Sequence, residues 1–187
     1  SAVFCGTSLG GLVTMLTAAR HPERVRAAIL NDIGPVIETD GLARIQDYTG
    51  KLPVCHDWQE AEAQVRAVYG DGLPDLSAKA WRELTTRSYA EDSEGRPLLR
   101  FDPNIGRAIR ELDMGLGDPW SLFGALEAVR TLVLRGALSD ILGRETVRQM
   151  QRRKPDLTAV EVPDRGHVPL LDEPVAVAAI HALLEEL

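Results

Sequence analysis

The sequence has few cysteines, few aromatic residues and no long apolar run. Of its 187 residues, two are cysteine (Cys5 and Cys55) and 5% are aromatic. Two cysteines are too few for a disulfide framework, which is typical of a reducing compartment. No apolar run reaches the length of a transmembrane helix, and no basic segment precedes the first apolar run. These absences predict a cytoplasmic protein that has no membrane partner.

Positive charge is also in short supply. The chain has 21 Lys and Arg against 28 Asp and Glu, a net charge of -7. Such a chain has no overall attraction for nucleic acid or anionic lipid, so we expect neither as a partner. Its histidines and cysteines lack the spacing of metal ligands, which predicts that there is no metal site. The length is sufficient for one domain with a substantial core.

The most informative segment is GTSLGG at residues 6–11, which follows the apolar run Ala2–Cys5 and precedes the apolar segment Leu12–Ala19. A G-x-S-x-G between a strand and a helix is the nucleophile elbow, a sharp turn that exposes its serine, here Ser8. We expect side chains at positions 6 and 10 to collide where strand and helix nearly touch, which explains both glycines. The first helical amides lack partners, so the helix N-terminus presents N–H groups and a positive dipole end to whatever the serine attacks.

Apolar runs at residues 24–31, 131–135 and 158–162 indicate further strands of a parallel sheet. Helices are expected over about 143–154 and at the C-terminus, where Asp172 is a candidate cap. Residues 35–126 have a different texture, with helical periodicity at 58–69 and 77–89. The prediction is an α/β core formed by residues 1–34 and 127–187, with a helical insertion at 35–126.

Three polar residues lie just beyond strand ends and could share one edge of this sheet. Asp140 follows the strand at 131–135, and His167 follows the strand at 158–162. Because the reactive crevice of a parallel sheet lies beyond its carboxyl ends, we expect Ser8, Asp140 and His167 to meet there. Asp32, directly after the second strand, is the alternative acid. Ser139 or Asp140 could instead cap a turn.

The segments GTSLGG, HPERV, LVLRGALSDIL and VPDRGHVPLLDEP together resemble the α/β-hydrolase superfamily, and most closely its small capped members with a serine nucleophile. The resemblance implies a mostly parallel, doubly wound sheet in which residues 35–126 form the cap. It also implies that Ser8 is the nucleophile, His167 the base and Asp140 the acid. Asp140 is preferred over Asp32 because the surrounding LSDIL resembles the family more closely. The Leu9 amide would be one oxyanion donor.

The chain departs from the family's pattern at its start. Family members place about four strands before the elbow, together with the loop that supplies a second oxyanion amide. Here only Ser1 precedes the elbow strand. The hypothesis is therefore that these residues are the later portion of a longer polypeptide. An N-terminal segment of the same protein would be the partner that the activity requires.

The predicted function is hydrolysis of a small ester, lactone or related acyl substrate through an acyl-enzyme, with no cofactor. A carbon–carbon bond hydrolase or an acyltransferase would use the same three side chains. A non-catalytic ligand-binding protein of the same fold is the alternative from another class. Trp120, where the chain returns from the insertion to the sheet, is a candidate substrate contact.

Overall fold

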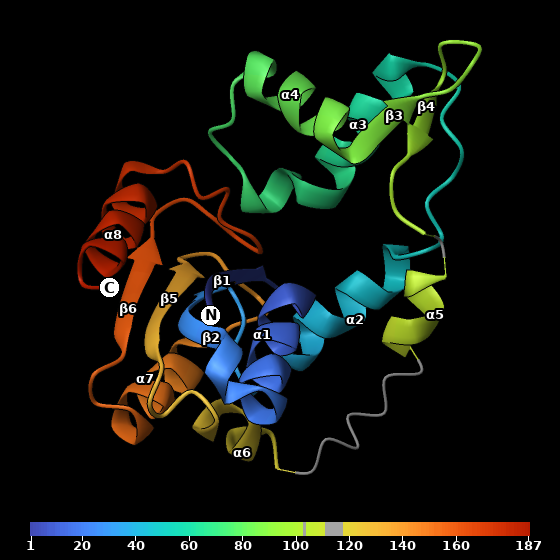
Figure 1. Ribbon diagram of the computed structural model, residues 1–187. Helices are drawn as coiled ribbons and strands as arrows, with labels where there is room; N and C mark the ends of the chain where they lie inside the picture. Colours follow the sequence, from blue (N-terminus) through green and yellow to red (C-terminus); the bar gives the residue numbers. More distant parts are fainter. Residues whose placement is uncertain (103, 111–117) are drawn as a thin grey trace. The chain divides into compact units, whose positions relative to one another are not determined.

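The computed structural model describes residues 1–102, 104–110 and 118–187 (Figure 1). The elements of the α/β core are β1 (Ala2–Thr7), α1 (Leu9–Arg20), η1 (Pro22–Arg24), β2 (Val25–Asn31), α6 (Pro119–Gly124), β5 (Arg130–Gly136), α7 (Arg144–Arg153), β6 (Thr158–Val162) and α8 (Pro174–Glu185). Between β2 and α6 lie α2 (Thr39–Tyr48), α3 (Trp58–Tyr69), η2 (Gly70–Gly72), α4 (Ala78–Ser88), β3 (Tyr89–Glu91), β4 (Pro97–Leu99) and α5 (Ile105–Arg110).

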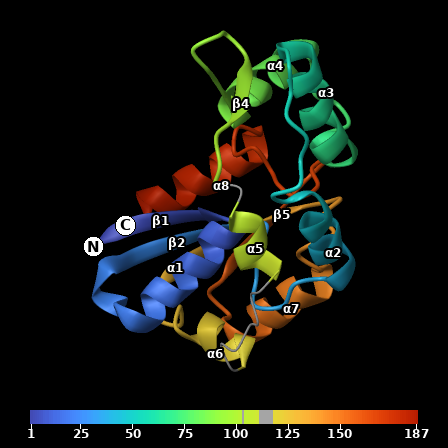
Figure 2. The same cartoon turned by 90° about the vertical axis from the view of Figure 1, so that its right-hand side faces the viewer.

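The described part of the core contains a four-stranded parallel sheet with the order β1-β2-β5-β6. Figure 2 shows α8 on one face of this sheet and α1 and α7 on the other. On the α8 face, alternate residues of the strands bury small and branched side chains against the helix: Ala27, Ile29, Leu132, Leu134 and Val162. Coverage on both faces explains why β2 and β5 are near-continuous apolar runs. The predicted α/β class with a parallel sheet is confirmed.

The chain divides into two compact units, one formed by residues 1–41 and 114–187 and the other by residues 42–113. The second unit lies within the predicted insertion of 35–126, and α3 and α4 match the two predicted helices. Residues 103 and 111–117 of the insertion are outside the described residues. The assignment of this unit as a cap stays a prediction.

The 42–113 unit has an interior of its own. Helices α3 and α4 pack together around buried Ala61, Val65 and Trp81, and β3 and β4 form an antiparallel hairpin. The guanidinium of Arg66 lies 4.8 Å from the centre of the Trp81 ring, within the range of a cation–π interaction. Burial raises the pKa of the Tyr89 phenol, whose hydroxyl donates to Gln64 Oε1.

The C-terminal helix begins differently from the prediction. Its N-cap is Glu173, followed by Pro174 at the first helical position, and not Asp172. The Glu173 carboxylate makes no cap bond to its own helix, because it accepts bonds from the amides of Leu170 and Leu171. Proline at the first position has no N–H to leave unpaired, so the helix can begin without a side-chain cap. No helix of the described residues is long and apolar enough to cross a membrane.

The turn between β1 and α1 is as sharp as the sequence indicates. Ser8 has φ 51° and ψ -117°, a conformation that L-residues rarely adopt. A Cβ on Gly6 would lie 2.4 Å from the carbonyl carbon and oxygen of Gly10, so strand and helix touch at this point. The expectation for Gly10 was wrong, because a Cβ there has no described neighbour within 4 Å. The second position without room for a side chain is Gly11, where a Cβ would lie 2.2 Å from Ile33 Cγ2.

This geometry predicts opposite outcomes for two glycines of one motif. Gly6→Ala should lower the free energy of unfolding by about 3 kcal/mol, because the methyl group would overlap backbone atoms that cannot move independently. Gly10→Ala is the matched control and should raise stability by up to about 1 kcal/mol, since alanine is the better helix former. Urea denaturation of both variants is the measurement. Equal destabilisation by the two substitutions would contradict this account of the elbow.

Candidate active site

The side chains of Ser8 and His167 meet at the carboxyl edge of the sheet. Ser8 follows β1, and His167 lies in the loop between β6 and α8. The distance between Ser8 Oγ and His167 Nε2 is 2.9 Å, a hydrogen bond between side chains separated by 159 positions. The histidine side chain is only 6% exposed. The structure therefore brings together two of the predicted site residues.

The third member of the chain of hydrogen bonds is Asp32. Its Oδ2 lies 2.8 Å from His167 Nδ1, and its side chain is fully buried. An ionised carboxylate only accepts hydrogen bonds, so Nδ1 carries the ring proton. In the neutral imidazole, Nε2 is then the unprotonated nitrogen and faces the Ser8 hydroxyl as an acceptor. This is the orientation that a general base needs before it removes a proton from the serine.

The preference for Asp140 over Asp32 is corrected by this geometry. Asp32 follows the last residue of β2 directly, whereas Asp140 lies four residues beyond the end of β5. The intervening loop turns so that Ser139, one residue earlier, faces Asp32. The Asp140 carbonyl lies against Gly41, where a Cβ would come within 2.1 Å of it. The position next to the histidine is therefore occupied by the alternative acid of the sequence analysis.

Three donors surround the Asp32 carboxylate. Oδ1 accepts a 2.8 Å hydrogen bond from the amide of Gly136, and Oδ2 accepts from Ser139 Oγ at 2.6 Å as well as from His167. The Ser139 oxygen in turn accepts from the amides of Ile141 and Leu142 at 3.1 and 3.0 Å. The capping role left open for Ser139 is thus confirmed. Because both amides point at its lone pairs, its single proton is directed to Asp32.

The loop after β5 is held by a buried arginine. Arg135, with a side chain 9% exposed, donates to the carbonyl of Leu142 at 2.7 Å and to that of Ser139 at 3.3 Å. Its guanidinium also pairs with Glu161 at 2.7 Å. Arg144 pairs with the same carboxylate, and the bond to Arg144, together with these charges, lowers the pKa of Glu161. The loop that carries Ser139 is therefore tied to the sheet below it.

The loop that carries His167 is fixed at both ends. Before the histidine, the carbonyl of Arg165 accepts from the amide of Leu138, and a Cβ on Gly136 would lie 2.4 Å from that carbonyl oxygen. After it, Glu173 accepts from the Leu170 amide and from Arg165 Nε. This buried carboxylate closes the loop on itself, so the imidazole is held by the backbone and not only by its own hydrogen bonds.

Sequence reasoning missed Asn31, which is 1% exposed at the end of β2. Its Nδ2 donates to Thr7 Oγ1 at 3.1 Å and to the carbonyl of Pro169 at 2.9 Å. Among the described residues, its Oδ1 is buried without a hydrogen-bond partner. A polar residue that ends an otherwise apolar buried strand is the signal that could have identified it.

The Leu9 amide is at the first position of α1, where an N–H has no acceptor within the helix. It directly follows Ser8, as expected for an oxyanion donor.

Trp120 is not placed as predicted. It packs edge-to-face on Phe123, and the guanidinium of Arg153 lies 4.2 Å from the centre of its ring. Helix α7 runs from the carboxyl end of β5 to the amino end of β6, so its last residue, Arg153, is at the amino edge of the sheet (Figure 1). Trp120 is therefore at the edge opposite Ser8, and a substrate contact is not supported.

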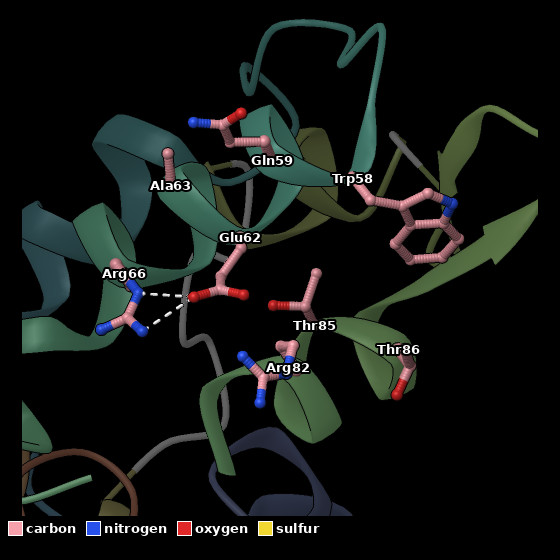
Figure 3. A pocket seen from close by; sticks show the side chains of 8 residues that line it. All are labelled: Trp58, Gln59, Glu62, Ala63, Arg66, Arg82, Thr85 and Thr86. Carbon is pink, nitrogen blue, oxygen red and sulfur yellow. Dashed lines mark hydrogen bonds and ion pairs between the residues drawn. The ribbon is translucent and has the colours of Figure 1, made fainter. Parts of the chain in front are cut away.

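The 42–113 unit contains a cavity of about 560 Å³ between α3 and α4. Figure 3 shows Trp58, Glu62, Arg66 and Arg82 among the side chains that line it. Glu62 is neutralised by Arg66, whose Nε and Nη2 lie 2.9 and 2.7 Å from its Oε1. This cavity belongs to a different unit of the chain from Ser8. Among the described residues, no group of three or more histidine, cysteine or acidic residues is arranged to hold a metal ion.

A parallel sheet with a serine at such an elbow defines the α/β-hydrolase class of fold. The chain belongs to the alpha/beta hydrolase family, which it matches over residues 1–180.

Relatives of known structure or activity support the same placement. An alpha/beta hydrolase from Novosphingobium aromaticivorans is 40% identical with a TM-score of 0.91, over 99% of this chain and 65% of its own. A 3-hydroxybutyrate-oligomer hydrolase from Cupriavidus necator is 35% identical over 92% of this chain and 61% of its own length. A pimeloyl-[acyl-carrier protein] methyl ester esterase from Klebsiella pneumoniae is 26% identical, over 94% and 66%. The chain spans less than two thirds of each relative's length.

The hydrogen bonds around Asp32 predict an unusually large loss of stability for one serine-to-alanine substitution. Ser139→Ala should lower the free energy of unfolding by about 2 kcal/mol, because it removes a donor to a buried charge and leaves two amides unpaired. Ser121 is the matched control, since its hydroxyl also bonds an aspartate, Asp118, but at 3.3 Å on the surface. Ser121→Ala should cost no more than about 0.5 kcal/mol. Denaturant titrations compare the two, and similar losses would contradict the role assigned to Ser139.

Proposed function

We propose that this chain carries the catalytic residues of a serine hydrolase that cleaves a small carboxylic ester or related acyl substrate. The observation that supports this most directly is the hydrogen-bonded series Ser8 Oγ, His167 Nε2, His167 Nδ1 and Asp32 Oδ2, with distances of 2.9 and 2.8 Å. The three roles are nucleophile, base and acid. The acid of the proposal is Asp32, in place of Asp140.

In the proposed reaction, His167 Nε2 takes the Ser8 proton as Oγ attacks the substrate's carbonyl carbon. The carbonyl oxygen becomes an oxyanion, to which the Leu9 amide donates at the positive end of α1. The imidazolium then protonates the leaving alcohol, and the acyl group remains on Ser8. Water, activated by the same histidine, releases the acid and restores the serine. Asp32 stabilises the imidazolium and holds the ring in the required tautomer.

The environment also favours Ser8 over the thiol of Cys5, which is close to it in sequence. Cys5 lies three residues earlier on β1, and desolvation raises the pKa of its thiol. A raised pKa reduces the thiolate fraction at neutral pH, and the thiolate is the reactive form of cysteine. Ser8, by contrast, has a base at hydrogen-bond distance.

The relatives support an ester as the bond that is cleaved. The names of the Cupriavidus and Klebsiella proteins describe hydrolysis of a hydroxybutyrate oligomer and of a methyl ester. Both substrates are aliphatic acyl compounds, so we propose short aliphatic esters and hydroxyacyl esters as the first substrates to test. The chain spans less than two thirds of these relatives, and we propose that activity requires the full-length protein.

Covalent labelling tests the nucleophile. A fluorophosphonate probe should label the full-length protein on Ser8, because only a serine with an adjacent base attacks the phosphorus readily. Ser8→Ala should abolish both labelling and ester turnover, whereas Ser139→Ala should still label. Mass spectrometry of the labelled peptide identifies the site. A folded wild-type protein that neither labels nor turns over esters would instead favour a ligand-binding protein of the same fold.

The acid is tested by comparing the two aspartates. Asp32→Asn should lower kcat by about 10⁴-fold, because an amide next to His167 favours the wrong tautomer and does not stabilise the imidazolium. Asp140→Asn is the matched control and should leave kcat within about threefold. Both are measured with a chromogenic short-chain ester, after circular dichroism has shown that the variants fold. The opposite ranking would restore Asp140 as the acid.

A further inference from the structure

The side chain of Asn31 touches two of the three segments that carry the proposed catalytic residues and belongs to the third. It ends β2, immediately before Asp32. Its Nδ2 donates to Thr7, the residue before Ser8, and to the carbonyl of Pro169, two residues after His167. In addition, the backbone carbonyl of Asn31 accepts a 3.1 Å hydrogen bond from the amide of Ser8.

The orientation of the Asn31 amide follows from its partners. The carbonyl of Pro169 can only accept, so the atom 2.9 Å from it is the NH₂ group and not Oδ1. The two hydrogens of this group serve the two acceptors, Pro169 O and Thr7 Oγ1. Oδ1 is then left buried without a partner among the described residues. A buried side-chain carbonyl without a hydrogen-bond partner lowers the stability of the fold. Unpaired buried groups of this kind are characteristic of functional sites.

We propose that Asn31 is a positioning residue for the reaction: it fastens the loop that carries His167 to the strand end that carries Ser8. The inference rests on the proposed function, because it assigns Asn31 a role in that same site. His167 lies on a loop and Ser8 on a strand, so their 2.9 Å separation depends on what joins these segments. The hydrogen bond to Pro169 joins them close to the imidazole, and catalysis is sensitive to displacements of about 1 Å.

The test replaces Asn31 with leucine, whose side chain has the same number of heavy atoms and the same branching but no hydrogen-bond donor. In the full-length protein, Asn31→Leu should lower kcat by about 10²-fold for a short-chain ester and leave KM within about threefold. Thr7→Val removes one of the two acceptors and keeps the bond to Pro169, so its loss of kcat should be smaller. Retention of kcat within twofold in Asn31→Leu would overturn the proposal.

A matched control separates positioning from general destabilisation. Thr131 is also 1% exposed and lies in the same sheet. Its hydroxyl donates to the backbone carbonyl of Val129, just before β5 and away from the site. Thr131→Val should lower Tm to a similar or smaller extent while kcat stays within twofold. If both variants lose kcat in proportion to Tm, the role of Asn31 is structural only. Should Asn31→Leu fail to fold, Asn31→Ser, whose hydroxyl is too short to reach Pro169, gives the same comparison.

A spectroscopic readout distinguishes this proposal from the proposed function. The Nδ1–H proton of His167, bonded to Asp32, should give a strongly downfield ¹H NMR resonance, assigned by its absence in His167→Ala. Asn31→Leu should broaden or abolish it, and Thr131→Val should leave it in place. If the resonance is unchanged in Asn31→Leu, the positioning role is overturned, even where the wild-type protein turns over esters. Its loss in a protein that shows no turnover would support the positioning role while the proposed function fails.

Discussion

The arrangement at the carboxyl edge of the sheet depends on one buried negative charge. The Asp32 side chain has no exposed surface, and an isolated carboxylate in such a place is strongly disfavoured. Here it is compensated by an amide, a hydroxyl and an imidazole, all within 2.8 Å. These three donors come from the end of β5, the loop after it and the loop after β6. Satisfying the charge therefore draws separate segments of the chain to one point.

The same requirement explains why neighbouring parts of the site are so closely restrained. Ser139 can donate to Asp32 because two amides and the Arg135 guanidinium fix its loop. His167 is held by a loop that Glu173 closes and that Asn31 contacts. Several of these features disfavour folding when taken alone, such as the positive φ of Ser8 and Asp32 and the unpaired Oδ1 of Asn31. Strain of this kind persists where the surrounding structure over-determines it, as at functional sites.

Much of the architecture could be predicted from local patterns. The structure has β1, β2, β5, β6, α1, α7 and α8 near the predicted bounds, whereas α6 lies within the stretch that was assigned to the insertion and was not predicted. Ser8 and His167 were identified because a glycine motif and a strand end mark them. The choice between Asp32 and Asp140 could not be made in this way, because both follow strands and both are close enough in sequence to a strand end to reach the same edge. Which of the two aspartates reaches His167 depends on the path of the loop between Gly136 and Ile141. No local sequence pattern predicts that path.

The sequence by itself determined the parallel α/β core, the elbow at Ser8 and the histidine beyond the last strand. Each rests on short-range chemistry, namely apolar periodicity, glycine at a close approach and polar residues at strand ends. Only the tertiary structure decided that Asp32 is the partner of His167, that Ser139 donates to Asp32 and Asn31 to the loop after His167, and that Trp120 lies at the opposite edge. The contacts of Asp32 with His167 and Ser139 and of Asn31 with Pro169 join residues more than 100 positions apart. Such contacts follow from how the strands are ordered and how the loops turn back, which only the folded chain fixes.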